Sequence, residues 1–489
     1  MTSERPTTRQ KALHLNLDDR KYGVIAEIGA GQEVARWFFV AGRAAGTVAK
    51  TISAYDMEVS DGIYGRAHRY VSRERLESML RHEFEQLVGR LDAKRGEQTS
   101  FFAFADTVAT RRADRPGPGE GWMGIRFQHA PRAEPSEILV HVSMLDRVRV
   151  HEQETLGVAG INLIYGAFYL HDDPPTLIAS LLDMLGRERI EVDVIKFCGP
   201  AFEGVDNRLM SLQLVEQGLC DAAMFLANGE VVQPSEVLYK RPVLVERGAF
   251  RPVTNLTLDM LEGARQQFVA EPGVAGQDPV ILLEMTLRDL TEGTSIAHTD
   301  FLARVDLLRA LGHGALVSRF ARYFGLVEFL YRYTDKPIGL AVGVPGVRAI
   351  VDEAFYEDLP GRLIESCGRL FKHNVKMYVY PWRDPESGRV VTIDDVPVPD
   401  SIRPLLAFLR GHGYVEPIGC WQDSCLDVDA AQVLARIQRG DPSWEDMVPP
   451  AVARAIREER LFGCVPPPGG SAVAAGAQAS ARAPSPRSA

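Results

Sequence analysis

Several features that would narrow the class of protein are missing from this sequence. No run of 18 or more apolar residues occurs in its 489 residues, so no segment is expected to cross a membrane as a helix. The polar, mixed-charge residues 1–21 contain no apolar stretch of the kind found in a signal peptide. These absences argue against a membrane partner and predict a cytoplasmic protein.

Cysteine is also scarce, with six residues scattered along the chain. Only Cys420 and Cys425 are close together, and their spacing does not match the C-x2-C half of a zinc site. The sequence therefore excludes a disulfide scaffold and argues against a structural metal. Reduced thiols agree with a cytoplasmic location.

An excess of basic charge is absent as well. The 55 Lys and Arg residues are outnumbered by 65 Asp and Glu, which gives a formal net charge of −10. Binding to nucleic acid depends on a basic face, so this balance argues against a nucleic-acid partner. The sequence also lacks G-x-S-x-G, H-E-x-x-H and P-loop motifs, so none of the mechanisms attached to these motifs can be assigned.

The remaining composition is that of an ordinary globular protein, with 46% hydrophobic and 25% charged residues. Length alone predicts about three domains. The segment 466–489 differs from the rest, because 20 of its 24 residues are Ala, Pro, Gly or Ser. Such a segment buries too little apolar surface to offset the entropy lost on folding, so we expect a disordered tail.

After a polar arm at 1–20, residues 21–185 have the pattern of an α+β region. A buried strand is expected at 24–28, followed by a glycine turn and a helix from Gln32. Ser72 is the expected N-cap of a long helix, whose apolar face consists of Leu76, Met79, Leu80, Phe84, Leu87, Val88 and Leu91. Further strands are expected at 101–105, 123–128 and 137–145, the last two antiparallel, and helices at 152–169 and 174–186.

Residues 186–385 alternate between strands and single helices, which predicts βαβ crossovers and a largely parallel α/β sheet. Asn207 and Thr299 are the expected caps of two of these helices. The strands are expected at 192–197, 222–226, 242–245, 280–285, 315–318, 338–342 and 376–380. The mainly helical residues 386–465 are expected to pack against this sheet.

Gly29 and Gly31 stand between a predicted strand and a predicted helix, where backbone N–H groups can bind an anion. A dinucleotide-binding fingerprint would require a third glycine at position 34, which is Val34. Glu33 adds a negative charge that repels phosphate. A tight strand-to-helix turn without a ligand is the alternative.

Four charged residues lie within or at the ends of apolar strands: Glu27, Asp106, Lys196 and Glu284. A lone charge in such a place costs several kcal/mol unless it is paired or neutralised. Asp106, Lys196 and Glu284 are expected at the carboxyl ends of their strands, where parallel sheets form clefts. We therefore expect catalytic roles in a cleft or, alternatively, structural ion pairs such as Lys196 with Glu284.

Arg241, Arg247 and Arg251 surround another apolar strand and are the best candidates for binding an anion. Strand alternation places Arg241 and Arg247 on one face, and guanidinium groups match phosphate or carboxylate ligands. A solvated basic strand is the alternative.

Asp56, Glu58 and Asp61 form an acidic set in an expected loop or edge strand. Carboxylates that alternate along a strand can share an ion, so these residues are candidate Mg²⁺ ligands. Helix capping is the alternative for each of them.

Three segments of the chain, residues 11–18, 26–36 and 205–216, read KALHLNLD, AEIGAGQEVAR and VDNRLMSLQLVE. Together they resemble a broad bacterial family of cytoplasmic proteins without assigned chemistry, some of which are labelled nicotinate-nucleotide adenylyltransferase. The resemblance covers nearly the whole chain before the tail and implies nucleotidyltransferase-like activity. The H/T-x-G-H element of such enzymes does not follow the first strand here, and its nearest counterpart, Leu311-Gly312-His313-Gly314, lies in mid-chain. No catalytic residue is therefore carried over.

Two hypotheses follow from the sequence. In the first, the protein is a transferase that acts on a phosphorylated or nucleotide-like small molecule. Arg241, Arg247 and Arg251 would bind the anion, and the strand carboxylates with Lys196 would supply acid–base, charge-stabilising or Mg²⁺-binding functions. In the second, the protein is a non-catalytic cytoplasmic scaffold or assembly subunit whose strand charges form structural pairs. Both are compatible with a homo-oligomer.

Overall fold

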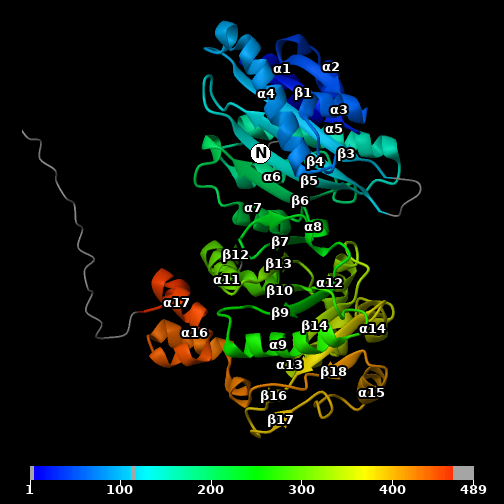
Figure 1. Ribbon diagram of the computed structural model, residues 1–489, viewed down its shortest axis with the longest axis vertical. Helices are drawn as coiled ribbons and strands as arrows, with labels where there is room; N and C mark the ends of the chain where they lie inside the picture. Colours follow the sequence, from blue (N-terminus) through cyan, green and yellow to red (C-terminus); the bar gives the residue numbers. More distant parts are fainter. Residues whose placement is uncertain (1–4, 112–116, 294, 466–489) are drawn as a thin grey trace, which may run out of the picture.

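The computed structural model describes residues 5–111, 117–293 and 295–465. The tail expected at 466–489 lies outside the described residues. The chain forms two large β-sheets with helices on their faces, which confirms the predicted α/β class. Figure 1 shows the N-terminal sheet and its helices stacked on the second sheet along the long axis of the molecule.

The first sheet has six strands in the order β2-β1-β3-β4-β5-β6. Strand β1 is parallel to β2 and β3, whereas β4, β5 and β6 continue the sheet in antiparallel pairs, which confirms the expected antiparallel pairing of the third and fourth predicted strands. The bounds are β1 (Lys21–Ile28), β2 (Val48–Ser53), β3 (Ser100–Ala109), β4 (Gly119–Phe127), β5 (Ser136–Met144) and β6 (Ile190–Cys198).

Helices cover both faces of this sheet. Helices α1 (Thr8–Leu17), α2 (Gln32–Ala41) and α5 (Arg149–Tyr169) pack through one apolar cluster on one face. On the other face, α4 (Arg73–Arg95) buries the apolar stripe that the sequence predicted against β1 and β3. Ser72 caps α4 as predicted, because its hydroxyl accepts from the Arg75 N–H.

The second sheet has eight strands in the order β18-β15-β14-β9-β10-β13-β7-β8. The six strands from β18 to β13 are mutually parallel, as predicted, whereas the pairings of β13 with β7 and of β7 with β8 at the edge are antiparallel. The bounds are β7 (Ala222–Phe225), β8 (Val231–Val232), β9 (Val243–Arg247), β10 (Val280–Thr286), β13 (Gly314–Ser318), β14 (Ile338–Gly343), β15 (Val375–Tyr380) and β18 (Val415–Pro417).

The two faces of the second sheet are covered by two different apolar clusters. Helices α9 (Asn255–Ala270) and α11 (His298–Ala310) share the first cluster, which continues into the N-terminal sheet. Helices α12 (Tyr323–Leu330), α13 (Val344–Ile350) and α14 (Arg362–Leu370) cover the other face.

Two predicted caps differ in the structure. Asp206, rather than Asn207, caps α7 (Asn207–Glu216), because the Asn207 side chain is used to pair with the backbone of Phe197. Thr299 does not cap α11, which begins one residue earlier at His298. In both cases the expected and the observed helix starts lie within one turn of each other. A sequence pattern does not locate the start of a helix more precisely than that.

The passage from one sheet to the other comes later than the expected boundary near residue 186. Strand β6 pairs with β5 and therefore belongs to the first sheet, so the change of sheet falls between β6 and β7. The two sheets meet there, since the N–H of Val192 donates to the carbonyl of Leu219 over 3.0 Å. Edge pairing of β6 depends on partners distant in sequence, which the local pattern did not reveal.

The C-terminal segment is mainly helical, as predicted, with α15 (Arg403–Gly411), α16 (Ala430–Arg439) and α17 (Pro450–Glu459). It also contributes β18, which extends the edge of the second sheet beside β15. Figure 1 shows α16 and α17 at one side of the second sheet, near α9 and α11.

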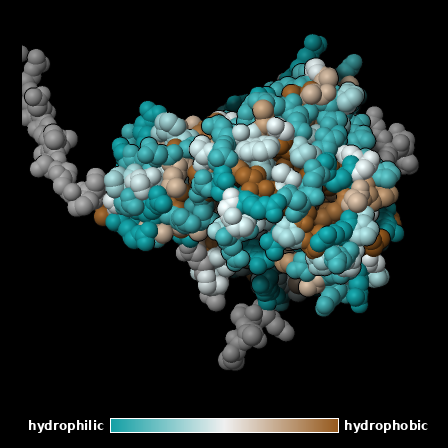
Figure 2. All heavy atoms as spheres, turned by 90° about the horizontal axis from the view of Figure 1, so that it is seen from below, coloured by the Kyte–Doolittle hydropathy of each residue, from teal (hydrophilic) through white to brown (hydrophobic). Residues whose placement is uncertain are grey.

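The end of the molecule seen in Figure 2 is mostly hydrophilic, with apolar patches between the polar side chains. Among the described helices, none combines the length and apolarity needed to cross a membrane.

Candidate functional site

The carboxyl ends of β1 and β3 bring Glu27 and Asp106 together. The strands are parallel, and the two residues lie directly opposite each other in their register. Both side chains are buried, and Asp106 is completely inaccessible to solvent. The N–H of Gly31 donates to Oε2 of Glu27 over 3.3 Å, and a Cβ added at Gly31 would lie 1.9 Å from Oδ2 of Asp106. The structure thus places Glu27, Gly29, Gly31 and Asp106 side by side.

The described residues compensate the two carboxyl groups of this pair only in part. Neither oxygen of Asp106 has a hydrogen-bond partner among the described residues, and Oε1 of Glu27 also lacks one. Burial raises the pKa of Asp106 well above its ordinary value, and the nearby Glu27 charge raises it further. Burial also raises the pKa of Glu27, although hydrogen bonds from Ser53 and Gly31 oppose the shift. The pair therefore keeps a proton to higher pH than exposed carboxyls, as a general acid must.

Close packing accounts for the two glycines of the turn. Gly29 has a φ of 115°, and a Cβ there would lie 1.9 Å from the carbonyl oxygen of Val108. The N–H of Gly31 is occupied by Glu27, so the negative group beside this turn is a carboxylate of the chain itself. This geometry matches a tight strand-to-helix turn, and anion binding by Gly29 and Gly31 stays a prediction.

The expected metal ligands do not converge. Asp56 caps the helix α3 (Met57–Tyr64), and Asp61 is hydrogen-bonded to Arg75 over 2.8 Å. Because this segment is a helix, Asp56 and Glu58 point in different directions, whereas on a strand they would share a face. In the part of the chain that the structure describes, no group of three or more His, Cys, Asp or Glu is arranged to hold a metal ion. The described residues thus do not bring Asp56, Glu58 and Asp61 together around one ion, and Mg²⁺ binding by them stays a prediction.

Glu284 lies near the carboxyl end of β10, where Arg247 of β9 neutralises it. Nε and Nη2 of Arg247 donate to the two carboxylate oxygens over 2.6 and 2.8 Å, and the Ser318 hydroxyl donates to Oε1 over 2.6 Å. The guanidinium also lies 4.3 Å from the centre of the Tyr323 ring. Glu284 is fully buried, so this is a desolvated bidentate ion pair. The expected pairing with Lys196 is wrong, because Lys196 is on β6 of the first sheet.

The three arginines predicted to bind one anion are distributed over both ends of β9. Arg241 precedes the strand and pairs with Asp278, whereas Arg247 and Arg251 lie at its carboxyl end. Arg251 pairs with Asp300 over 2.8 Å. Six residues of extended chain span roughly 20 Å, so Arg241 cannot reach a ligand shared by the other two. The structure therefore does not bring all three arginines together, and anion binding by Arg247 and Arg251 stays a prediction.

The strand order of the second sheet reverses between β9 and β14. The chain forms β9, adds β10 and β13 on one side, and then adds β14, β15 and β18 on the other. In doubly wound sheets of this order, ligands bind in the crevice outside the carboxyl ends of the strands at the reversal. Glu246 occupies this position, since it lies opposite Leu283 of β10 and Ala341 of β14.

Glu246 is a candidate to which the sequence analysis assigned no role. Its side chain is buried, and Oε2 has no hydrogen-bond partner among the described residues. Burial raises the pKa of Glu246 well above its ordinary value. The sequence signal for Glu246 is a carboxylate directly after the apolar residues of the run VLVE. The same pattern indicated Glu284.

Arg304 of α11 is a second residue that the sequence did not indicate. It is almost fully buried, and its Nη1 donates to the carbonyl of Ala249 over 3.0 Å in the loop after β9. Its guanidinium also pairs with Asp300, which is the carboxylate that Arg251 contacts. Arg304 therefore fixes the loop that leads from the end of β9 to α9, a role that no local pattern announces.

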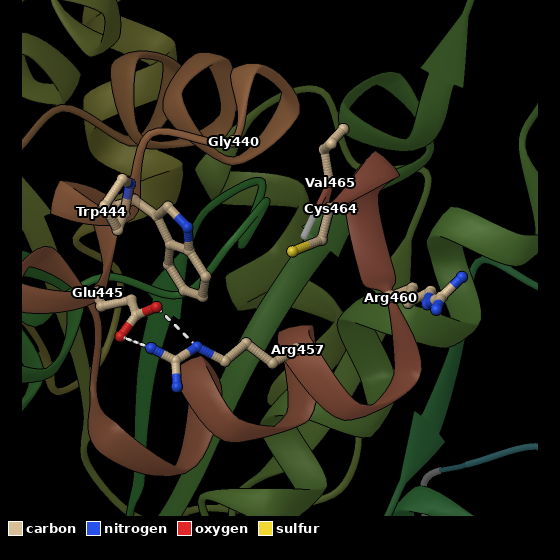
Figure 3. A pocket seen from close by; sticks show the side chains of 8 residues that line it. Gly440, Trp444, Glu445, Arg457, Arg460, Cys464 and Val465 are labelled. Carbon is tan, nitrogen blue, oxygen red and sulfur yellow. Dashed lines mark hydrogen bonds and ion pairs between the residues drawn. The ribbon is translucent and has the colours of Figure 1, made fainter. Parts of the chain in front are cut away.

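A pocket of about 180 Å³ lies within the C-terminal helical segment. Figure 3 shows Arg457 directed at Glu445, and the ion pair between them neutralises both charges. Trp444, Cys464 and Val465 contribute apolar surface to the same pocket. Because this ion pair leaves neither of its charges available for catalysis, the pocket is not a candidate catalytic site.

The described residues thus define an α/β protein in which a mixed sheet is followed by a doubly wound, largely parallel sheet. No family model matches the chain, and no curated protein matches it. Among solved structures it is similar to the competence/damage-inducible protein CihA from Agrobacterium tumefaciens, with 15% identity over 34% of this chain and 99% of that chain, at a TM-score of 0.25. A competence or damage-inducible protein from Enterobacter asburiae matches with 14% identity over 33% and 99% of the chains, at a TM-score of 0.24. Nicotinic acid mononucleotide adenylyltransferase from Plasmodium falciparum matches with 9% identity over 46% and 98%, at a TM-score of 0.30.

Proposed function

We propose that this protein is an enzyme that binds a phosphorylated, nucleotide-like small molecule at the carboxyl edge of the second sheet, between the ends of β9 and β14. The observation that carries the proposal is the buried carboxyl group of Glu246 at the reversal of strand order. A ligand crevice is expected at that position in a doubly wound sheet, and burial raises the pKa of Glu246, which favours the protonated form that a general acid needs.

The connection from β9 to α9 supports a phosphorylated ligand. Helix α9 has 16 residues and begins beside this edge, where Thr254 caps its first turn. The N-terminus of a helix carries partial positive charge, which favours an anionic group nearby. Arg251 and Arg304 bring two guanidinium groups to the same connection through their shared partner Asp300.

Group transfer is the reaction class that we propose for this site. Transfer between phosphorylated substrates depends mainly on positioning and on stabilising charge, and a protonated carboxyl can deliver a proton to the leaving group. Mg²⁺ would arrive with the substrate phosphates, because it is usually held by one or two carboxylates together with phosphate oxygens. Glu27 and Asp106 are proposed as a separate acid–base pair in the first sheet.

The proposal is tested by titrating the full-length protein with ATP, ADP, AMP and glucose 6-phosphate in the presence of Mg²⁺. At least one compound is expected to raise the melting temperature, because a ligand at 100 times its Kd stabilises a protein by about 2.7 kcal/mol. Glu246→Gln should weaken that compound about tenfold or more in calorimetry. Asp278→Asn, at the exposed amino end of the sheet, is the matched control and should leave the affinity unchanged. Absence of binding across the panel would contradict the proposal.

A second candidate function is a non-catalytic scaffold or assembly subunit. The observation in its favour is the internal pairing of charges that a catalytic site would leave available, above all Arg247 with Glu284. This alternative predicts no response to the ligand panel and a large homogeneous oligomer in light scattering. The enzyme proposal instead predicts saturable binding that depends on Glu246.

A further inference from the structure

A cavity of about 410 Å³ lies at the amino edge of the second sheet, outside the sites described above. It is formed by the starts of β14 and β15, the turn before β18 and the C-terminal end of α9. Small-molecule sites typically have volumes of roughly 300–1,000 Å³ and combine apolar and aromatic walls with a few polar groups. Glu246 and the residues beside it in sequence are not among the described residues that line this cavity, so the two places are separate.

The lining of this cavity combines buried aromatic rings with exposed polar side chains. Phe268 and Tyr378 are buried, and their ring centres lie 6.2 Å apart. His373 and His412 are exposed, and the ring of Tyr414 lies nearly parallel to that of His412 with 6.4 Å between their centres. The cavity thus offers aromatic rings to a ligand from α9, from β15 and from the turn before β18.

Two carboxylates and one ammonium group meet at one side of the cavity. Nζ of Lys376 lies 2.5 Å from Oε1 of Glu271 and 3.0 Å from Oε1 of Glu416. Burial opposes the charged form of Lys376, but its hydrogen bonds with the two carboxylates raise its pKa above the ordinary value. The described lining contains this one lysine and no arginine. With both carboxylates ionised, the three groups carry a net negative charge.

Glu271 keeps one carboxylate oxygen for a further partner. Its Oε1 accepts from Lys376 and, over 3.2 Å, from the Tyr378 hydroxyl, whereas Oε2 makes no hydrogen bond with the described residues. Glu271 also follows directly on the last residue of α9, whose last turn contains no basic residue. The C-terminal end of a helix carries partial negative charge and stabilises a nearby cation. Both features favour a positively charged group in this cavity.

We propose that this cavity binds a small organic cation: an aromatic ring that carries a primary ammonium group. The ammonium group would donate to Glu271 and complement the C-terminal end of α9. The ring would pack among Phe268, Tyr378 and Tyr414, whose faces also attract a cation. This ligand site does not rest on the function proposed at Glu246.

The inference is tested by calorimetric titration of the full-length protein at pH 8 with phenethylamine, tyramine and tryptamine. The matched ligands are phenylpropionate, hydroxyphenylpropionate and indolepropionate, which keep each ring and replace the ammonium group by a carboxylate. At least one amine is expected to bind, and its carboxylate counterpart is expected to bind about tenfold more weakly or worse, because it meets a net negative charge. Absence of amine binding overturns the proposal, and so does a carboxylate that binds as tightly as its amine.

Two variants with opposite expected effects assign the binding to this cavity. Glu271→Gln should weaken the amine about tenfold or more, because it removes the carboxylate that accepts from the ammonium group. Lys376→Met should instead strengthen the amine about threefold or more, because two carboxylates are left without their cation. Melting temperature verifies that each variant folds, and a single folded variant suffices for the test. Unchanged amine affinity in a folded variant overturns the assignment.

Glu262→Gln is the matched control, since Glu262 is on the same helix, forms a half-exposed ion pair with Arg265 and is not among the described residues that line the cavity. This variant removes the same charge from α9 and should leave amine affinity unchanged. An equal loss in Glu262→Gln and Glu271→Gln would indicate a general effect of net charge and would overturn the inference. Amine binding without any response to the phosphorylated compounds would support this inference and contradict the function proposed at Glu246. The two proposals can therefore fail independently.

Discussion

The buried carboxyl pair of the first sheet predicts that Asp106→Asn stabilises the protein. Asp106 is completely inaccessible, neither of its oxygens has a hydrogen-bond partner among the described residues, and Glu27 lies opposite it. Asparagine has the same shape but carries no charge to desolvate. Its amide group can also donate to Oε1 of Glu27, which lacks a partner in the wild-type protein.

The size of the effect depends on pH in a defined direction. Burial raises the folded-state pKa of Asp106 above its ordinary value of 3.8, so the folded protein holds a proton that the unfolded chain releases. Stability is therefore complete below the ordinary pKa and falls as pH rises toward the folded pKa, by about 1.4 kcal/mol per pH unit. Asp106→Asn removes this loss. Its advantage over the wild type should therefore grow as the pH rises from 5 to 7, by at most about 3 kcal/mol over these two pH units.

Urea unfolding at pH 5, 6 and 7 measures this difference. Trp122 is a suitable fluorescent reporter, because it is buried on β4 opposite Thr107 of the strand that carries Asp106. Asp278→Asn is the matched control, since Asp278 is exposed and its ion pair with Arg241 contributes little. The control should change stability by less than about 1 kcal/mol at every pH.

Two outcomes would refute this reasoning. If Asp106→Asn lowers stability at pH 7, the carboxylate must have a stabilising partner that the packing does not provide. If the variant and the wild type lose stability with pH at the same rate, Asp106 does not hold the proton.

Three further predictions follow from the packing around the predicted site residues. Arg247→Met should destabilise the protein by about 3–5 kcal/mol in urea unfolding, because it leaves Glu284 buried without its partner, and the double variant Arg247→Met/Glu284→Leu should recover part of the loss. Gly31→Ala should cost about 1–3 kcal/mol, because the added methyl group would meet Asp106, and equal melting temperatures would contradict the packing described here. Lys196→Met should change stability by less than about 0.5 kcal/mol, since Lys196 forms no ion pair with the described residues, whereas a larger loss would indicate that it neutralises a buried carboxylate.

Much of the fold could be predicted from the sequence, because its signals are local. The helix that begins after Ser72 is determined by a capping side chain and by apolar residues at helical spacing. The alternation of strands and helices after residue 280 likewise predicts a parallel sheet, since parallel neighbours require crossover connections. The membership of β6 in the first sheet could not be predicted, because its partner β5 lies more than 40 residues earlier in the chain.

The candidate sites show the same division between local and tertiary information. Apolar runs interrupted by charge identified Glu27, Asp106 and Glu284 as residues that need compensation, since an isolated buried charge is costly in any fold. Which compensation each received was decided only by the pairing of distant strands: Glu284 met Arg247, whereas Asp106 met a second carboxyl group. The sequence by itself thus determined the fold class and the positions of the buried charges. Tertiary structure decided which charges are neutralised and which keep a proton, because electrostatic energies depend on distances in space rather than along the chain.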